Sequence, residues 1–147
     1  MVKNGFLHCH TMYSLFDSAI TPNDLVKRAK ELGAKNITLT DHGTLLGIEP
    51  FMDAGKEYGI NTIPGVELYL ANREHFILFA KNYTGYQAIS KTMRNANYET
   101  SKRNKKGKEG SQKSYACVPD DVLSQLKGNK DIIATTACMQ GPIAKIL

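Results

Sequence analysis

The 147-residue sequence contains no apolar run near the ~20 residues that a membrane-spanning helix needs. The N-terminus also lacks the basic and apolar regions of a secretory signal peptide, because polar residues and glycine interrupt it. Its three cysteines, Cys9, Cys117 and Cys138, are odd in number and widely spaced. This spacing argues against a disulfide framework. We therefore expect a protein without a membrane partner that resides in a reducing cytoplasm.

Two common nucleotide-binding patterns are also missing. No G-x-G-x-x-G follows the first expected strand, and no G-x-x-x-x-G-K-[ST] occurs anywhere. The length is about that of one domain, and the fractions of 41% hydrophobic and 22% charged residues are ordinary for a globular chain. We expect a single domain over residues 1–147.

The net positive charge is concentrated in residues 101–114. This segment holds six of the 19 basic residues and one of the 14 acidic ones, so the rest of the chain is neutral. Its glycines, serines and lysines predict a flexible loop outside the core. A solvated loop is the favoured interpretation. The alternative is contact with nucleic-acid phosphates through a set of basic side chains: Lys102, Arg103, Lys105, Lys106 and Lys108.

Short apolar runs alternate along the chain with segments of helical periodicity. Strands are expected at 4–10, 36–40, 61–70, 75–80 and 131–137. Helices are expected at 21–33, 48–59, 86–98 and 119–128, with another beginning at 141. This alternation predicts an α/β protein with a parallel sheet covered by helices, either an open doubly wound sheet or a βα barrel.

The stretch "FLHCH" places two of the chain's four histidines one residue apart. On a strand, His8 and His10 point to the same face while Cys9 points to the other. Paired neutral imidazoles are good ligands for a zinc-like cation. A pair of hydrogen-bonded histidines at a strand end is the alternative.

Other reactive residues also fall near the carboxyl ends of expected strands. Asp41 and His42 follow the second strand, Glu67 lies within the third, and Cys138 follows the last. Active sites of parallel α/β folds lie at this edge. We expect a metal site there, with Asp41 orienting a ligand imidazole from behind.

Five stretches carry a family resemblance over essentially the whole chain: "LHCHTMYSLFD", "TLTDHGTLLGIEPF", "IPGVELYL", "HFILFAKNYTGYQAISK" and "IIATTACMQGPIAKIL". Together they resemble the PHP domain (polymerase and histidinol phosphatase) at the N-terminus of the bacterial DNA polymerase III alpha subunit. The resemblance implies a distorted seven-stranded, TIM-like βα barrel, here partial, with up to three divalent ions, zinc or manganese. The implied ligands are His8, His10, Asp17, His42, Glu67, His75 and Cys138.

The activity implied by the resemblance is phosphoester hydrolysis, associated in polymerase relatives with 3′ to 5′ proofreading. DNA and the remainder of a polymerase chain, or other replisome subunits, are the implied partners. Some family members have lost the ligands and keep the domain as a scaffold. Three of the implied ligands have ordinary alternatives: Cys138 as a buried thiol, Asp17 as a helix-entry residue, and His75 as a strand cap. His75 opens its strand, which in a parallel barrel is the wrong end.

The sequence departs from the family pattern in two respects. The family has a later Asp-x-His motif that this sequence lacks, and five expected strands fall short of seven. We expect an incomplete domain: the front of a longer protein, a truncated chain, or a split or degenerate version. The retained ligands favour a phosphoesterase or exonuclease lineage. The missing motif favours a non-catalytic scaffold or partner-binding domain, or a fragment of a free-standing phosphatase. No polymerase carboxylates are recognisable, so the chain alone should not synthesise DNA.

Overall fold

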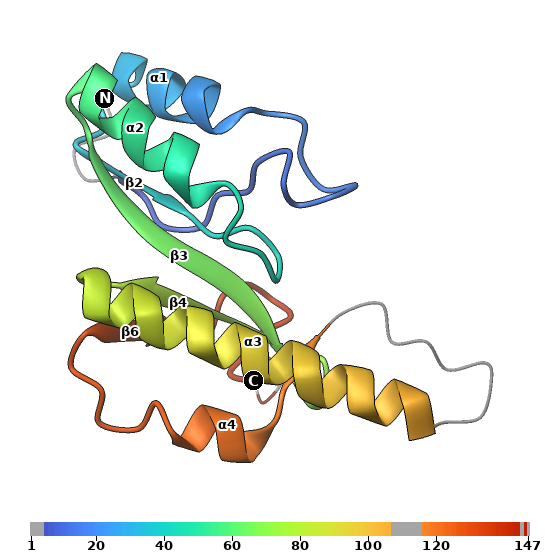
Figure 1. Ribbon diagram of the computed structural model, residues 1–147. Coiled ribbons are helices and arrows are strands. Elements are labelled where there is room, and N and C mark those ends of the chain that lie inside the picture. Colours follow the sequence, from blue (N-terminus) through green and yellow to red (C-terminus); the bar gives the residue numbers. More distant parts are fainter. Residues whose placement is uncertain (1–4, 107–115, 145, 147) are drawn as a thin grey trace. The chain divides into compact units, whose positions relative to one another are not determined.

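The computed structural model describes residues 5–106, 116–144 and 146 (Figure 1). The chain forms two compact units, Met1–Glu67 and Leu68–Leu147, and both combine helices with strands. The mixed α/β class expected from the sequence is therefore confirmed. None of the described helices is long and apolar enough to cross a membrane.

The first unit is a parallel sheet with two helices. Strand β1 (Gly5–Phe6) pairs with β2 (Asn36–Leu39), which pairs with the first half of β3 (Asn61–Leu70). Helices α1 (Pro22–Glu31) and α2 (Ile48–Tyr58) pack against each other over these strands (Figure 1). The core between the layers is apolar and fully buried, with Val26, Ile37, Leu39, Phe51 and Val66 among its members.

Local chemistry accounts for the ends of these helices. The Thr21 hydroxyl accepts a hydrogen bond from the Asp24 N–H at 3.1 Å, which caps α1, and Pro22 occupies the first helical position. Helix α2 ends at Gly59, whose φ of 61° is in the left-handed region that glycine tolerates best. These boundaries lie within two residues of those expected from the sequence.

The second unit begins with a chain reversal. The Leu70 N–H donates to the Glu74 carbonyl at 2.8 Å, so residues 71–74 turn the chain from the end of β3 into β4 (His75–Ala80). Strand β4 pairs antiparallel with β6 (Ile132–Thr135), and the short β5 (Cys117–Val118) pairs parallel with the end of β3. Helix α3 (Tyr83–Lys106) packs on β4 and β5, and α4 (Asp120–Ser124) packs on α3.

Several expectations about these elements were wrong. The sheet is not wholly parallel, because the tight turn before β4 leaves no room for a crossover helix. Residues 101–106 are not loop but the last turns of α3, whereas the remainder of the expected basic loop lies outside the described residues. Strand β1 ends at Phe6, before the histidine pair, and residues 141–144 form turns in place of a helix.

Candidate metal centre

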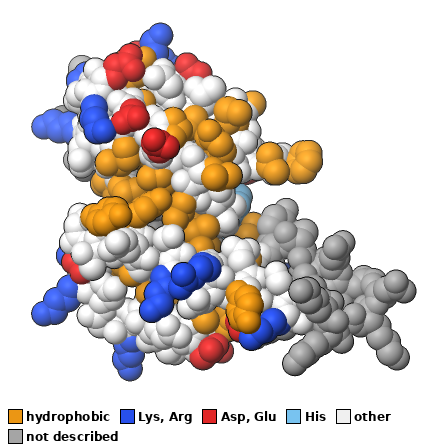
Figure 2. Space-filling view, viewed as in Figure 1, with side chains coloured by type: hydrophobic (Ala, Val, Ile, Leu, Met, Phe, Trp, Pro, Cys, Tyr) orange, Lys and Arg blue, Asp and Glu red, His pale blue; other side chains and the backbone are white. Residues whose placement is uncertain are grey.

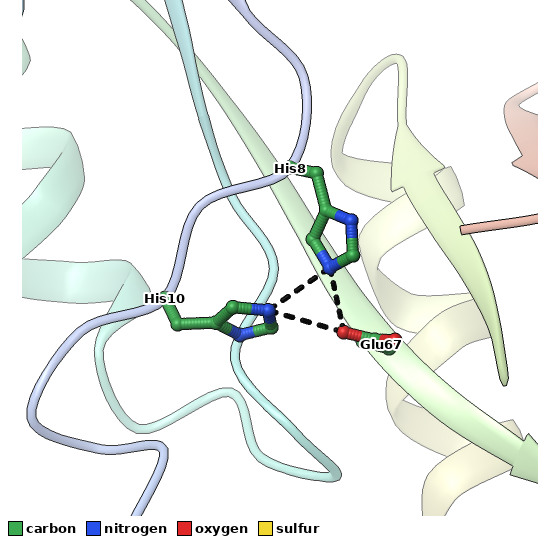
Figure 3. Close-up of side chains that lie close together, drawn as sticks. All are labelled: His8, His10 and Glu67. Atoms are coloured by element: carbon green, nitrogen blue, oxygen red, sulfur yellow. Dashed lines mark hydrogen bonds and ion pairs between the residues drawn. The ribbon is translucent and has the colours of Figure 1, made fainter. Parts of the chain in front are cut away.

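Three side-chain atoms of the first unit converge on one point (Figure 3). The Nε2 atoms of His8 and His10 lie 2.9 Å apart, and Oε2 of Glu67 lies 2.7 Å from the first and 3.1 Å from the second. Glu67 is 1% exposed, whereas both imidazoles are partly accessible. A buried carboxylate thus faces the nitrogens of two imidazoles that solvent can partly reach.

Backbone pairing brings these residues together. The chain bends at residues 7–8 after β1, but the N–H of Thr40 donates to the Cys9 carbonyl at 2.8 Å and so holds the histidine pair beside the end of β2. The N–H of Glu67 donates to the Asp41 carbonyl at 3.1 Å, and that of Gly43 donates to the Glu67 carbonyl at 2.8 Å. The histidine pair is therefore brought together as expected, although it lies just after the strand and not within it.

The donor set fits a divalent cation. Two imidazole lone pairs and a carboxylate oxygen repel one another at about 3 Å unless a proton or a cation lies between them. Zinc–nitrogen bonds of about 2.0–2.1 Å place tetrahedral ligand atoms roughly 3.3 Å apart. The observed separations of 2.7 to 3.1 Å need only a small expansion to reach that value.

A second set of donors lies next to the first. Oδ2 of Asp17 is 3.7 Å from Nδ1 of His10 and 3.7 Å from Nε2 of His42. The rings of His10 and His42 stack with centroids 4.5 Å apart and planes inclined by 8°, and Nδ1 of His42 is 3.6 Å from Glu67. All five ligands expected in the first unit are therefore neighbours, and they divide into two overlapping groups of three.

The electrostatics of the cluster favour a negative Glu67 beside positive partners. Burial would raise the pKa of the Glu67 carboxyl, but hydrogen bonds from His10 and His8 and the nearby charge of His42 lower it to about 2. Burial similarly opposes the charged form of His10, yet the Glu67 carboxylate raises its pKa above the ordinary 6.5. Without a metal, the raised pKa of His10 favours a protonated, positively charged imidazole beside this carboxylate.

Asp41 anchors the loop that carries the cluster. Its carboxyl oxygens accept hydrogen bonds from the Thr11 N–H at 2.6 Å, the Thr11 hydroxyl at 2.7 Å and the Ser14 hydroxyl at 3.2 Å. The side chain is 1% exposed. A hydrogen-bonded path runs from Asp41 through the Ser14 hydroxyl to His10, and the Asp41 charge also contributes to the raised pKa of His10.

Ser14 orients His10. Its Oγ accepts the N–H of His42 at 2.9 Å and lies 3.2 Å from Nδ1 of His10. A hydroxyl has one proton to donate and two lone pairs. Because its proton goes to Asp41, the remaining lone pair can accept Nδ1–H of His10, so Nε2 is the nitrogen that faces Glu67 and would bind a metal once it loses its proton. Sequence reasoning missed Ser14, although its position four residues after His10 was a usable signal.

Replacing Asp41 with alanine should cost about 2–4 kcal/mol of unfolding free energy, because three hydrogen-bond donors lose a buried acceptor. Asp41→Asn keeps one acceptor and should cost less. Urea denaturation measures both. Asp53→Ala is the matched control, because its exposed pair with Lys56 should contribute less than ~1 kcal/mol. Equal stabilities of Asp41→Ala and Asp53→Ala would contradict this anchoring role.

The remaining expected ligands lie in the second unit. Sγ of Cys138 is 3.9 Å from Nδ1 of His75, and the thiol is exposed, so it is not an ordinary core cysteine. The His75 N–H donates to the Gln140 carbonyl at 3.0 Å, and its ring meets the edge of Tyr69. The turn at 71–74 places the start of β4, and therefore His75, beside the carboxyl end of β3, so His75 lies at that end although it opens its strand.

The basic residues expected to contact nucleic acid lie at the end of α3. Lys102 pairs with Glu99 at 3.4 Å, and its ammonium lies 4.2 Å from the centre of the Tyr98 ring. Arg103, Lys105 and Lys106 belong to the last helical turns, and Lys108 lies outside the described residues. The exposed Tyr98 adds an aromatic surface to this basic segment that the sequence did not indicate.

The family model described as the PHP domain matches residues 7–147. The DNA polymerase III subunit alpha of Helicobacter pylori is 37% identical over 149 residues, and that of Borreliella burgdorferi is 32% identical over 155. The first alignment covers 93% of this chain and 11% of the relative, the second 96% and 12%. The chain thus spans about a tenth of the length of these curated relatives.

Two further similarities are more limited. The PolC-type DNA polymerase III of Thermotoga maritima is 49% identical over 71 residues, which covers 48% of this chain and 5% of the relative. A solved putative metal-dependent phosphoesterase from Bifidobacterium adolescentis superposes with a TM-score of 0.55 at 24% identity. That match covers 89% of this chain and 46% of the other, and it concerns the fold.

Proposed function

Because the chain belongs to the PHP domain family, we propose that it is the metal-binding PHP region of a bacterial DNA polymerase III alpha-like protein. In this proposal the domain holds divalent ions and belongs to a phosphoesterase or 3′ to 5′ exonuclease lineage. The fold we propose is part of a distorted βα barrel, supported by the likeness to a solved phosphoesterase. The two relatives above that exceed 30% identity over most of the chain are polymerase subunits, so a fragment of a free-standing phosphatase is less favoured.

The convergence of His8, His10 and Glu67 carries this proposal. Two imidazoles and one carboxylate suit zinc or manganese. Asp17 and His42 lie within reach to hold a second ion that shares the cluster. We propose His75 and Cys138 as further ligands because imidazole and thiolate are donors of the same kind.

Bound ions would supply an activated water and a positive clamp for phosphate oxygens. The protein's own residues prepare for that chemistry. Glu67 retains a negative charge, and Ser14 with Asp41 holds His10 in one orientation. His42 stacks on His10 and so limits rotation of both rings. A purely structural role is less favoured, because a scaffold has no need for a buried carboxylate facing two imidazoles.

Elemental mass spectrometry of the purified chain tests the proposal. At least one divalent ion per chain is expected after equilibration with zinc or manganese, because three donors already lie within 3.1 Å of one another. Dialysis against a chelator should remove the ion and lower the melting temperature. A chain that retains no ion at saturating metal would contradict the proposed function.

We also propose that the basic segment touches the phosphates of single-stranded DNA. Replacing Lys105 and Lys106 with glutamine should then reduce the slope of log affinity against log salt by about 1.4, or ~0.7 per lost contact. Fluorescence anisotropy at several salt concentrations measures the slope. Lys27→Gln with Lys35→Gln removes the same charge from exposed positions elsewhere. Equal slopes for the two double variants would contradict this proposal and would favour the interpretation of the basic segment as solvated surface.

A further inference from the structure

The loop between β1 and α1 holds two large apolar side chains in solvent. Leu15 is 77% exposed and Phe16 is 107% exposed, so its ring contacts almost nothing in the chain. The loop projects away from the strands and helices of the first unit (Figure 1). Apolar side chains stand out from the surface on the same side of that unit (Figure 2). Exposing a whole aromatic ring forfeits the burial that makes phenylalanine useful in a core.

Phe16 also has an unfavourable backbone conformation. Its φ of 67° lies in the left-handed region, which glycine or asparagine adopts more easily than phenylalanine. The loop is nevertheless well anchored, since the Met12 N–H donates to the Ile20 carbonyl at 2.8 Å and the Asp17 N–H to the Ser14 carbonyl at 3.0 Å. The loop therefore holds the ring outward at a cost in stability, which is typical of residues that bind ligands.

The ring is attached directly beside the proposed metal centre. Asp17, the next residue, has its carboxylate 3.7 Å from both His10 and His42. Neighbouring Cα atoms are about 3.8 Å apart. A nucleotide whose phosphate lies at the ligand cluster would therefore bind one residue away from the position that carries the Phe16 ring.

We propose that Phe16 positions the substrate by stacking on a nucleobase while the adjoining phosphodiester lies at the metal cluster. This inference rests on the proposed function and specifies its substrate as single-stranded nucleic acid. A nucleobase is favoured as the occupant because one exposed planar ring is joined through Asp17 to the proposed metal centre, where a phosphate would bind. Stacking on such rings contributes about 1–3 kcal/mol per base and tolerates any base.

The absence of tryptophan from the sequence makes a direct test possible. Phe16→Trp introduces the only indole, whose fluorescence should be quenched by a five-residue oligothymidylate. An abasic deoxyribose-phosphate oligomer of the same length and charge should quench it much less. Leu32→Trp, at the C-terminal end of α1, is the matched control and should respond to neither oligomer. Equal quenching of the Phe16→Trp variant by both oligomers would overturn the proposal.

Affinity for the two oligomers provides a second readout. Phe16→Ala should weaken oligothymidylate binding at least about fivefold and leave abasic binding unchanged, whereas Phe16→Tyr should retain the affinity. Phe16→Gly should weaken binding equally while raising the melting temperature by ~2–4 °C, because it relieves the left-handed strain. Unchanged oligothymidylate affinity in the Phe16→Ala variant would overturn the stacking proposal. The same holds if this variant changes only the self-association of the chain and not its affinity for the oligomer.

Measuring with and without manganese separates the two claims. If the wild type binds no ion yet distinguishes bases from abasic sugar through Phe16, the metal proposal fails and the stacking proposal stands. If the wild type binds the ion and all Phe16 variants bind both oligomers equally, the metal proposal stands and the stacking proposal fails.

Discussion

A chain that carries both His8→Ala and His10→Ala is expected to lose its divalent ion. These residues supply two of the three donors that converge within 3.1 Å, and Glu67 alone cannot hold a cation against water. Changes to supporting residues around a metal typically cost 10–100-fold in affinity, so the loss of two direct ligands should exceed about 100-fold. Titration against a competing chelator, followed by elemental analysis, measures the effect.

Cys9→Ala is the matched control for the histidine pair. Cys9 lies between the two histidines, and burial raises the pKa of its thiol to about 11, despite an opposing backbone hydrogen bond from His8. Among the described residues, Cys9 belongs to none of the groups whose donor atoms lie close enough together to hold a metal. The control should keep the wild-type metal content, and circular dichroism should show that both variants are folded. Equal metal content in the wild type and the double-histidine variant would refute the assignment of this cluster.

The 147-residue chain is expected to hydrolyse phosphoesters poorly even when an ion is bound. The sequence has no Asp-x-His motif after His75, so two ligands implied by the family resemblance are missing from it. Hydrolysis by clustered ions depends on fixed spacing between the attacking and leaving oxygens, and an ion with too few ligands loses that spacing. We therefore expect this chain to bind a metal ion and yet show little hydrolysis of phosphoesters.

Single-stranded DNA labelled at its 5′ end, incubated with manganese or zinc, measures turnover. The wild-type rate should lie within about twofold of the rate of a Glu67→Ala variant, because both 147-residue chains lack the Asp-x-His ligands that the family resemblance implies. Glu49→Ala removes an exposed carboxylate from α2 and controls for the change in charge. Steady 3′ to 5′ shortening by the wild type and the Glu49→Ala variant, lost only in Glu67→Ala, would show that one well-held ion suffices.

Local sequence patterns determined most of the secondary structure. Alternation and apolar runs predicted β3 and β4 at the residues where they occur, and Thr21 and Gly59 marked helix ends through hydrogen bonding and backbone preference. The same patterns placed His8, His10, His42 and Glu67 near one edge of a sheet. These predictions succeeded because they depend on contacts between residues close in the chain or on the regular geometry of paired strands.

Where the sequence failed, the deciding contacts were of other kinds. The segment after residue 100 continues as helix because lysine and arginine are good helix formers and Lys102 pairs with Glu99 one turn earlier. The sequence prediction missed this helical preference because the whole segment 101–114 is rich in charged residues and glycine, which favoured a loop. The antiparallel pairing of β4 with β6 joins residues 52 to 58 positions apart, which no local pattern specifies.

The sequence by itself therefore determined the mixed α/β class and most of the residues that cluster at the candidate site, because these follow from residue type, spacing and local periodicity. Only the tertiary structure decided how the ligands are held. Ser14 contacts both Asp41, which lies 27 residues later in the chain, and His10, which lies four residues earlier. The outward ring of Phe16 depends on a left-handed backbone angle that its neighbours impose. Both features arise from hydrogen bonds that form only after distant segments have packed, so they leave no periodic trace in the sequence.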